Sequence, residues 1–291
     1  MSADRPGPLV SAEWLTAHLG DPGLRIVHIS SDRKAYDQGH IPGAVFSDLH
    51  TDLAKGGTDP RTGDISRHYL VPTREDVAEA LARWGVAPEM RVVLYDDVGQ
   101  GRYAARGYWL LRLYGFPAER VHLLDGGLTV WQAEGRPTTA EAAALAAGEA
   151  TQPLGERDES LIATAEQVLA WSREACAPGG PTRLLDVRLI DEYLGHDVRA
   201  ARGGRIAGSR FRVFTDFVAP DGKLRPPADA VTILKATGVE PQELRAIYCQ
   251  GGVRAALVWF VLHELAGFPE VRNYAESWEE WGNCPELPVE A

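Results

Sequence analysis

The 291-residue sequence lacks the features of a membrane protein or of a disulfide-stabilised protein. It contains no run of about 18 apolar residues, the length that spans a bilayer as a helix. Its N-terminus has no basic start, apolar stretch or small-residue cleavage site of a secretory signal. Only three cysteines occur, at positions 176, 249 and 284, too few for a disulfide framework or a paired-cysteine metal site. These absences predict a cytoplasmic protein without a membrane partner.

Positive charge is also scarce. Lys and Arg number 30 against 41 Asp and Glu, which leaves a net charge of −11. A surface this acidic repels nucleic acid and anionic lipid, so neither is an expected partner. The eight histidines lack the spacing of metal ligands, and we expect neither a metal nor a cofactor. Hydrophobic residues make up 45% of the chain, which is typical of a globular protein.

The length fits two domains, and the pattern of apolar residues repeats. Short apolar runs alternate with segments of helical period, which predicts an α/β fold with parallel strands joined by helices. Expected strands lie at 24–29, 92–95 and 121–124, then at 184–187 and 246–248. Expected helices lie at 73–84 and 103–114, then at 228–237 and 253–266, and residues 255–262 are apolar enough to predict a buried helix.

Individual residues repeat in the same order as the elements. The paired segments are 39–44 (Gly-His-Ile-Pro-Gly-Ala) with 204–209 (Gly-Arg-Ile-Ala-Gly-Ser), the Gly-Phe-Pro at 115–117 with that at 267–269, and Trp131 with Trp281. We interpret the chain as two copies of one domain, residues 1–135 and 161–291, each a small parallel sheet flanked by helices. Residues 136–160, rich in Ala with Pro and Gly, form the expected linker.

The two copies differ at the end of one strand. Aligning Tyr95 with Tyr248 sets Asp96 of the first copy opposite Cys249 of the second. Ligands of parallel sheets bind at the carboxyl ends of the strands, where both side chains are expected. We predict that Cys249 is a nucleophile, and the alternative is a small side chain buried in the core.

The residues after Cys249 favour a reactive thiolate. A helix that begins near Val253 directs free N–H groups at the preceding loop and stabilises negative charge there. Gly251 and Gly252 allow successive N–H groups to face inward, and Arg254 adds positive charge.

Four motifs together resemble those of a rhodanese-type sulfurtransferase with tandem domains, the thiosulfate and 3-mercaptopyruvate sulfurtransferase family. They are residues 39–44, Asp186-Val-Arg188 with Glu192-Tyr193, Cys249–Arg254 and Ser277–Trp281. The resemblance covers nearly the whole chain and implies two rhodanese-like domains, of which the first is catalytically inactive and the second active. It implies that Cys249 takes a sulfane sulfur from a small anionic donor as a persulfide and passes it to cyanide or a thiol.

The resemblance also implies further donor-binding residues. They are the loop residues Gln250, Gly251, Gly252, Val253 and Arg254, together with Arg188 and His68. The loop N–H groups are expected to stabilise the persulfide anion. Arg188 matches an arginine near the pocket that holds the anionic donor, and a pairing with a neighbouring carboxylate is its alternative.

The donor is less clear from the motifs. In relatives that use 3-mercaptopyruvate, a serine and a threonine stand where this chain has Gly251 and Arg254, and these departures favour thiosulfate. His68 matches a histidine of the mercaptopyruvate type, but the aspartate that partners it there corresponds to His50. A 3-mercaptopyruvate sulfurtransferase and a non-catalytic persulfide carrier or redox-sensing module therefore stay open as alternatives.

Three other features carry competing interpretations. The loop from Cys249 to Arg254 is one residue shorter than in cysteine-dependent phosphatases, which argues against a phosphatase. The segment 99–104 (Gly-Gln-Gly-Arg-Tyr-Ala), with Asp125 further on, fits a dinucleotide fingerprint, although the repeat explains it as the counterpart of the cysteine loop. Five arginines within 199–212, a segment without Asp or Glu, would either steer an anion or pair with carboxylates elsewhere.

Overall fold

The computed structural model describes residues 6–58, 65–98, 100–143 and 154–291, with the backbone alone at 58 and 65–68. Of the predicted linker, residues 144–153 lie outside the described part. The chain forms two compact units. The first holds the described residues of Met1–Ala54, Pro72–Asp158 and Ala219–Leu224, and the second those of Lys55–Val71, Glu159–Val218 and Arg225–Ala291. Each unit thus includes a short segment from the other half of the sequence.

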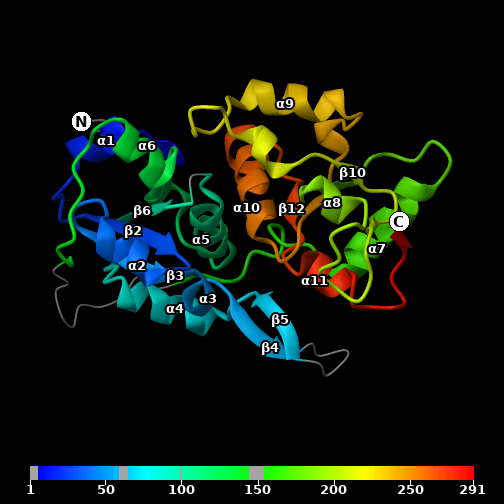
Figure 1. Ribbon diagram of the computed structural model, residues 1–291, viewed down its shortest axis with the longest axis horizontal. Coiled ribbons are helices and arrows are strands. Elements are labelled where there is room, and N and C mark those ends of the chain that lie inside the picture. The colour runs from blue at the N-terminus through cyan, green and yellow to red at the C-terminus, as the bar shows by residue number, and fades with distance from the viewer. Residues whose placement is uncertain (1–5, 59–64, 99, 144–153) are drawn as a thin grey trace. The chain divides into compact units, whose positions relative to one another are not determined.

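The first unit contains a five-stranded parallel sheet in the order β1-β7-β6-β2-β3, of which Figure 1 labels β2, β3 and β6. Its strands are β1 (Leu9–Val10), β2 (Leu24–Ser30), β3 (Ala44–Asp48), β6 (Arg91–Asp96) and β7 (Val121–Leu124). Its helices are α1 (Ala12–Ala17), α2 (Arg33–Gln38), α3 (Leu49–Asp52), α4 (Arg74–Arg83), α5 (Arg102–Leu113) and α6 (Gly127–Ala133).

Helices cover both faces of this sheet, and the alternation of side chains along β6 explains why. Val93 packs with Leu15 of α1 and Trp131 of α6 on one face. The next residue, Leu94, points to the other face, where its Cδ1 would lie 3.2 Å from a Cβ added to Gly107 of α5. Because successive strand residues face opposite sides, the middle of a strand covered on both sides is apolar, as in the predicted run from Val92 to Leu94.

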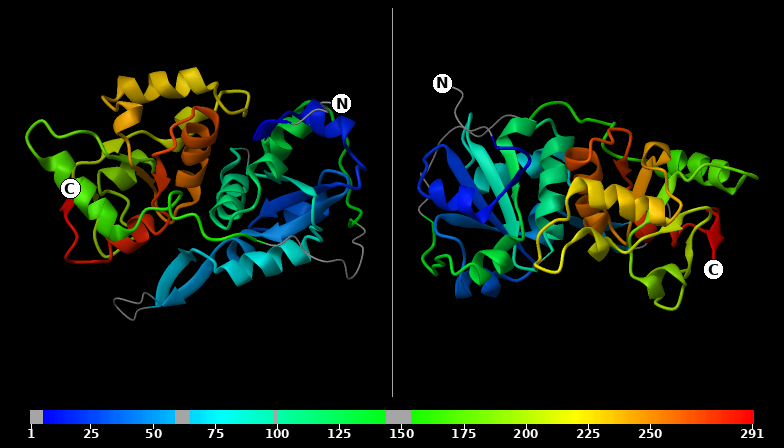
Figure 2. Two further views of the ribbon diagram at one scale, coloured as in Figure 1. Left: turned by 180° about the vertical axis from the view of Figure 1, so that it is seen from behind. Right: turned by 90° about the horizontal axis from the view of Figure 1, so that it is seen from above.

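The second unit repeats this plan with a four-stranded parallel sheet in the order β10-β8-β11-β12. Its strands are β8 (Leu184–Asp186), β10 (Arg210–Phe211), β11 (Ala246–Tyr248) and β12 (Arg272–Asn273). Its helices are α7 (Ala165–Cys176), α8 (Ile190–Tyr193), α9 (Pro227–Ala236), α10 (Val253–Trp259) and α11 (Ser277–Trp281). In Figures 1 and 2, α9 and α10 lie on one side of this sheet and α7 and α11 on the other.

Two antiparallel strand pairs complete the second unit. β9 (Arg205–Ile206) pairs with β13 (Val289–Glu290), and β4 (Lys55–Thr58) pairs with β5 (Ile65–Leu70). The β4–β5 hairpin comes from the first half of the sequence, yet it belongs to the second unit. The sequence pattern does not predict this hairpin.

Equivalent hydrogen bonds confirm that the two units are copies of one fold. The hydroxyl of Tyr95 accepts a hydrogen bond from the N–H of Ile41 at 3.1 Å, and Tyr248 accepts one from Ile206 at the same distance. The indole N–H groups of the paired tryptophans donate to main-chain carbonyls six or seven residues further on, from Trp131 to Pro137 and from Trp281 to Pro288. The predicted α/β class and each predicted strand and helix are confirmed, with bounds that differ by at most one residue when the helix expected at 253–266 is taken as α10 together with the π-helix that continues it.

The apolar helix after Cys249 is buried as predicted, but it is not α-helical throughout. It runs as α10 to Trp259 and continues as the π-helix η4 (Phe260–Leu265). The side chains from Ala255 to Leu262 are fully buried. Across the described residues, no helix has the length and apolar character that crossing a membrane requires.

Candidate active site

Cys249 lies directly after β11, at the carboxyl end of an internal strand of the second sheet. Its N–H donates to Oγ of Ser277 at 3.0 Å, and its carbonyl accepts from the N–H of Trp278 at 3.1 Å. The start of α11 therefore holds the end of β11 in place. The Cys249 residue is 1% exposed.

Ser277 belongs to the motif Ser277–Trp281, which by itself assigns this serine no role. Its Oγ donates to the carbonyl of Tyr274 at 2.7 Å while it accepts from Cys249. Its φ of 52° is one of two positive values among the described residues other than glycine. Backbone strain of this kind persists where the surrounding contacts fix it, and it is concentrated at functional sites.

The loop after Cys249 turns through Gly252 into α10. Gly252 adopts a left-handed conformation with φ 76°, and a Cβ there would lie 2.5 Å from the carbonyl oxygen of Ala275. The first helical hydrogen bond joins the N–H of Ala256 to the carbonyl of Gly252 at 3.1 Å. The N–H groups of the first turn before it have no partner within the helix, so this turn can hold an anion.

The counterpart loop in the first unit holds an anion of its own. The carboxylate of Asp96, at the end of β6, accepts from the N–H groups of Gly101, Tyr103 and Ala104 at 3.3, 2.8 and 3.3 Å. Asp96 is fully buried, and burial raises its pKa above the usual value despite these N–H donors. One copy thus fills its loop with a carboxylate where the other has a thiol.

This arrangement also bears on the dinucleotide fingerprint at 99–104, of which Gly99 lies outside the described residues. The N–H groups that would bind a pyrophosphate at the start of α5 already bind Asp96. The carboxylate of Asp125, which would bind the ribose, accepts the N–H of Leu224 at 2.8 Å. Both contacts argue against a dinucleotide site. Within the described chain, no three His, Cys, Asp or Glu side chains gather as metal ligands.

Arg254 closes the cysteine loop and pairs with Glu192 of α8. Its two terminal nitrogens lie 2.6 and 2.8 Å from the two carboxylate oxygens. Burial alone would raise the pKa of Glu192, but the hydrogen bonds and charge of Arg254 lower it below its usual value. Burial likewise opposes the charge on Arg254, yet Glu192 and the nearby Cys249 raise its pKa above the ordinary value. The positive charge of Arg254 therefore lies within electrostatic reach of Cys249.

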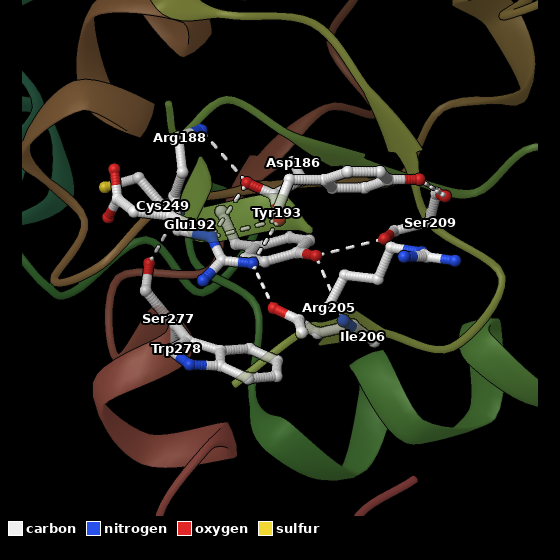
Figure 3. A network of polar contacts seen from close by, with 12 residues as sticks. Asp186, Arg188, Glu192, Tyr193, Arg205, Ile206, Ser209, Cys249, Ser277 and Trp278 are labelled. Atoms are coloured by element: carbon white, nitrogen blue, oxygen red, sulfur yellow. Dashed lines mark hydrogen bonds and ion pairs between the residues drawn. The ribbon is translucent and has the colours of Figure 1, made fainter. Parts of the chain in front are cut away.

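Arg188 lies on the neighbouring strand end, in a buried network that Figure 3 draws with Cys249 and Ser277. It is 1% exposed. Its guanidinium donates to both carboxylate oxygens of Asp186 at 2.6–3.0 Å (Figure 3). It also donates to the carbonyl of Gly204 at 2.7 Å. It also lies 4.5 Å from the ring centre of Trp278. These contacts correspond to the alternative in which Arg188 pairs with a neighbouring carboxylate.

The structure brings the other loop candidates together. Gln250 donates through Nε2 to the carbonyl of Arg199 at 3.0 Å, and Val253 begins α10 with 8% exposure. Gly251 packs against Tyr69 of the β4–β5 hairpin. The backbone of His68 is part of β5, but its side chain lies outside the described residues.

The arginines of 199–212 are engaged mostly within the second unit. Three form ion pairs: Arg199 with Asp197 at 2.6 Å, Arg205 with Glu290 at 3.3 Å and Arg212 with Asp216 at 2.7 Å. Arg202 donates to main-chain carbonyls between 281 and 287. Their positive charge is largely neutralised locally, which favours pairing over steering of an anion.

Sequence and structure comparisons agree with this description. The rhodanese-like domain matches the chain twice, at residues 11–134 and 164–284. The chain belongs to the rhodanese family of sulfurtransferases, with two rhodanese-like domains.

Relatives of similar identity carry different names. The thiosulfate sulfurtransferase of Corynebacterium glutamicum is 38% identical over 98% of this chain and 91% of its own. The probable 3-mercaptopyruvate sulfurtransferase of Pseudomonas aeruginosa is 37% identical over 97% of each. The sulfur carrier protein TtuD of Thermus thermophilus is 32% identical over 99% of this chain and 98% of its own.

Among solved structures, SseA from Escherichia coli, described under 3-mercaptopyruvate sulfotransferases, matches with a TM-score of 0.73. It is 26% identical, and the match covers 94% of this chain and 99% of SseA.

Proposed function

We propose that the protein is a thiosulfate sulfurtransferase that works through a persulfide on Cys249. The observation that carries this proposal is the placement of Cys249 between an internal strand and a glycine turn into α10. A thiol at the carboxyl end of a strand, facing the first-turn N–H groups of a helix, suits nucleophilic chemistry on an anion.

The proposed reaction has two steps at one sulfur. The Cys249 thiolate attacks the outer sulfur of thiosulfate, the S–S bond of the donor breaks, and sulfite leaves with its electron pair. The Cys249 persulfide is then attacked at its outer sulfur by cyanide or a thiolate. That step releases thiocyanate or a new persulfide and restores the Cys249 thiolate, as in ping-pong kinetics.

The chain's own groups would stabilise the charges of these steps. The N–H groups of the loop and first helical turn would hold the negative charge of the persulfide. Arg254, oriented by Glu192, adds positive charge nearby. Burial of Cys249 would exclude bulk water from a reactive intermediate. We assign Arg188 a positioning role, because its hydrogen bonds are made to Asp186 and Gly204.

Two features of the loop support thiosulfate over 3-mercaptopyruvate. Gly251 provides no hydroxyl to polarise a keto acid, and Arg254 is bound to Glu192 rather than offering a threonine hydroxyl. The match to 3-mercaptopyruvate sulfurtransferases keeps that donor as the second candidate. We further propose that the domain of residues 1–135 transfers no sulfur itself, because Asp96 occupies its loop.

A steady-state comparison of the two donors, with cyanide as acceptor, tests this assignment. We expect kcat/KM for thiosulfate to exceed that for 3-mercaptopyruvate by about 100-fold, or about 2.7 kcal/mol of transition-state binding. The reverse ratio would assign the enzyme to the mercaptopyruvate type. Stoichiometric persulfide formation with negligible turnover of either donor would instead indicate a sulfur carrier, the name given to one relative.

A further inference from the structure

The two glycines after Cys249 are required for different reasons. Gly252 has a positive φ, and a side chain there would meet the backbone of Ala275. Gly251 has no positive φ, so its backbone conformation is open to any residue. A Cβ at Gly251 would nevertheless lie 2.6 Å from both Cβ and Cδ2 of Tyr69 and 2.8 Å from its Cγ. Tyr69 therefore leaves no room for a side chain at position 251.

Tyr69 cannot easily withdraw from this position. The closest atoms of Tyr69 include its Cβ, which moves only with the backbone. Its N–H donates to Oε2 of Glu279 at 3.3 Å, and the N–H of Glu279 donates to the carbonyl of Gln250 at 2.8 Å. Figure 1 labels the two elements that Glu279 connects, β5 and α11. The hairpin is thus attached to the same loop that it covers.

We propose that Tyr69 is a specificity-determining residue of the Cys249 loop, which it keeps free of a side chain at position 251. The proposal rests on the proposed sulfur transfer and extends it to donor selection. With no side chain at 251, a donor meets main-chain N–H groups there, which suit an anionic oxygen or sulfur. A hydroxyl at 251, which would hydrogen-bond a keto acid, is excluded by the tyrosine rather than by the loop's own conformation.

A double-mutant cycle tests the coupling between the two positions. Gly251→Ser alone should lower both the Tm and kcat/KM for thiosulfate, the latter by about tenfold or more, because the new side chain overlaps Tyr69. Tyr69→Gly combined with Gly251→Ser should recover most of that loss, because glycine removes the Cβ as well as the ring. Tyr69→Phe combined with Gly251→Ser should not, because phenylalanine keeps the Cβ and the ring.

Gly252→Ser is the matched control for the neighbouring glycine. Its defect arises from a positive φ and from the backbone of Ala275, so Tyr69→Gly should leave that defect unchanged. In the variant that combines Tyr69→Gly with Gly251→Ser, the ratio of kcat/KM for 3-mercaptopyruvate to kcat/KM for thiosulfate should rise at least about tenfold above wild type. A purely structural role for Tyr69 would restore the Tm without moving this ratio.

Two outcomes would overturn the proposal: a Gly251→Ser variant with wild-type Tm and turnover, or a defect that Tyr69→Gly does not relieve. An unchanged donor ratio in the rescued variant would refute the role in specificity. The Tm and the rate at which iodoacetamide alkylates Cys249 report on the coupling without any donor. If they show the coupling while neither donor turns over, the proposed sulfur transfer fails and the contact between Tyr69 and the loop stands.

Discussion

At the residue scale, the buried pair of Glu192 and Arg254 connects stability to pH. Because Arg254 lowers the pKa of Glu192 in the folded state, the pair stabilises the protein fully above the unfolded pKa of about 4.3. This contribution is lost as the pH falls through the lower, folded-state pKa. Glu192→Gln should therefore destabilise the protein by about 3 kcal/mol at pH 7, since it leaves the charge of Arg254 without its partner.

Urea unfolding at pH 7, 5 and 4 would measure this effect, and the difference between wild type and Glu192→Gln should narrow towards the lowest pH. Asp191→Asn is a suitable control, because that neighbouring side chain is 70% exposed and should have little effect at any pH. A constant difference across the pH series would contradict the assignment of the pair.

Arg188 gives a second prediction at this scale. Arg188→Ala should lower the free energy of unfolding by about 3–5 kcal/mol, because Asp186 is fully buried and loses its ion-pair partner. If Arg188 instead binds the donor directly, Arg188→Ala should raise the KM for thiosulfate and leave the urea midpoint nearly unchanged. Measuring both quantities on the same preparation distinguishes the two.

At the element scale, α11 positions the end of β11 through Ser277. Ser277→Ala removes the acceptor of the Cys249 N–H and the donor to Tyr274, which should cost about 1–3 kcal/mol. It should also lower kcat with little change in KM, because the nucleophile is displaced rather than the donor contacts. Ser172→Ala is a matched control: that serine is also buried and donates to the carbonyl of Ala207, but it belongs to α7. Equal effects of both variants on kcat would refute the positioning role.

Elements with strong local patterns were predictable from the sequence, and elements held by tertiary contacts were not. The buried strands β2 and β6 are rich in Val, Ile and Leu, and Gly252 was recognisable as a turn residue. The strand β4 (Lys55-Gly-Gly-Thr) has no apolar alternation, and its pairing with β5 and place in the second unit depend on residues far along the chain.

The same division applies to the candidate site. The sequence motif identified Cys249 and its loop, because the residues that form it are consecutive. The motif could not show whether the guanidinium of Arg188 binds a donor or other groups of the protein. Its hydrogen bonds to Asp186 and Gly204 form only when the chain is folded. Nor could the motif identify Tyr69, whose contact with Gly251 joins positions distant in the sequence.

At the scale of the whole molecule, the two units use equivalent loops in different ways. In the first unit the Asp96 carboxylate accepts hydrogen bonds from the N–H groups of its own loop. Asp96→Asn should weaken these hydrogen bonds and lower the Tm. The kcat/KM for thiosulfate should stay at the wild-type value. A thermal melt and a thiocyanate assay on one sample measure both. A loss of turnover with an unchanged Tm would show that the first loop takes part in the reaction.

The dinucleotide interpretation makes a separate prediction for the whole chain. Because Asp96 already binds the N–H groups that a pyrophosphate would need, and Asp125 already accepts the N–H of Leu224, NAD should not raise the Tm. Thermal melts over a series of NAD concentrations measure this, with sulfite or thiosulfate as the comparison ligand. A Tm that rises with NAD concentration would reopen that interpretation.

The central claim is that Cys249 carries the transferred sulfur, and mass spectrometry of the thiosulfate-treated protein tests it most directly. The peptide that contains Cys249 should gain about 32 Da, the mass of one sulfur, and lose it when cyanide is added. Peptides with Cys176 and Cys284 serve as internal controls and should stay unchanged, as should the Cys249→Ser variant. Thiocyanate formation without a persulfide on Cys249, or an equal yield on all three cysteines, would contradict the account.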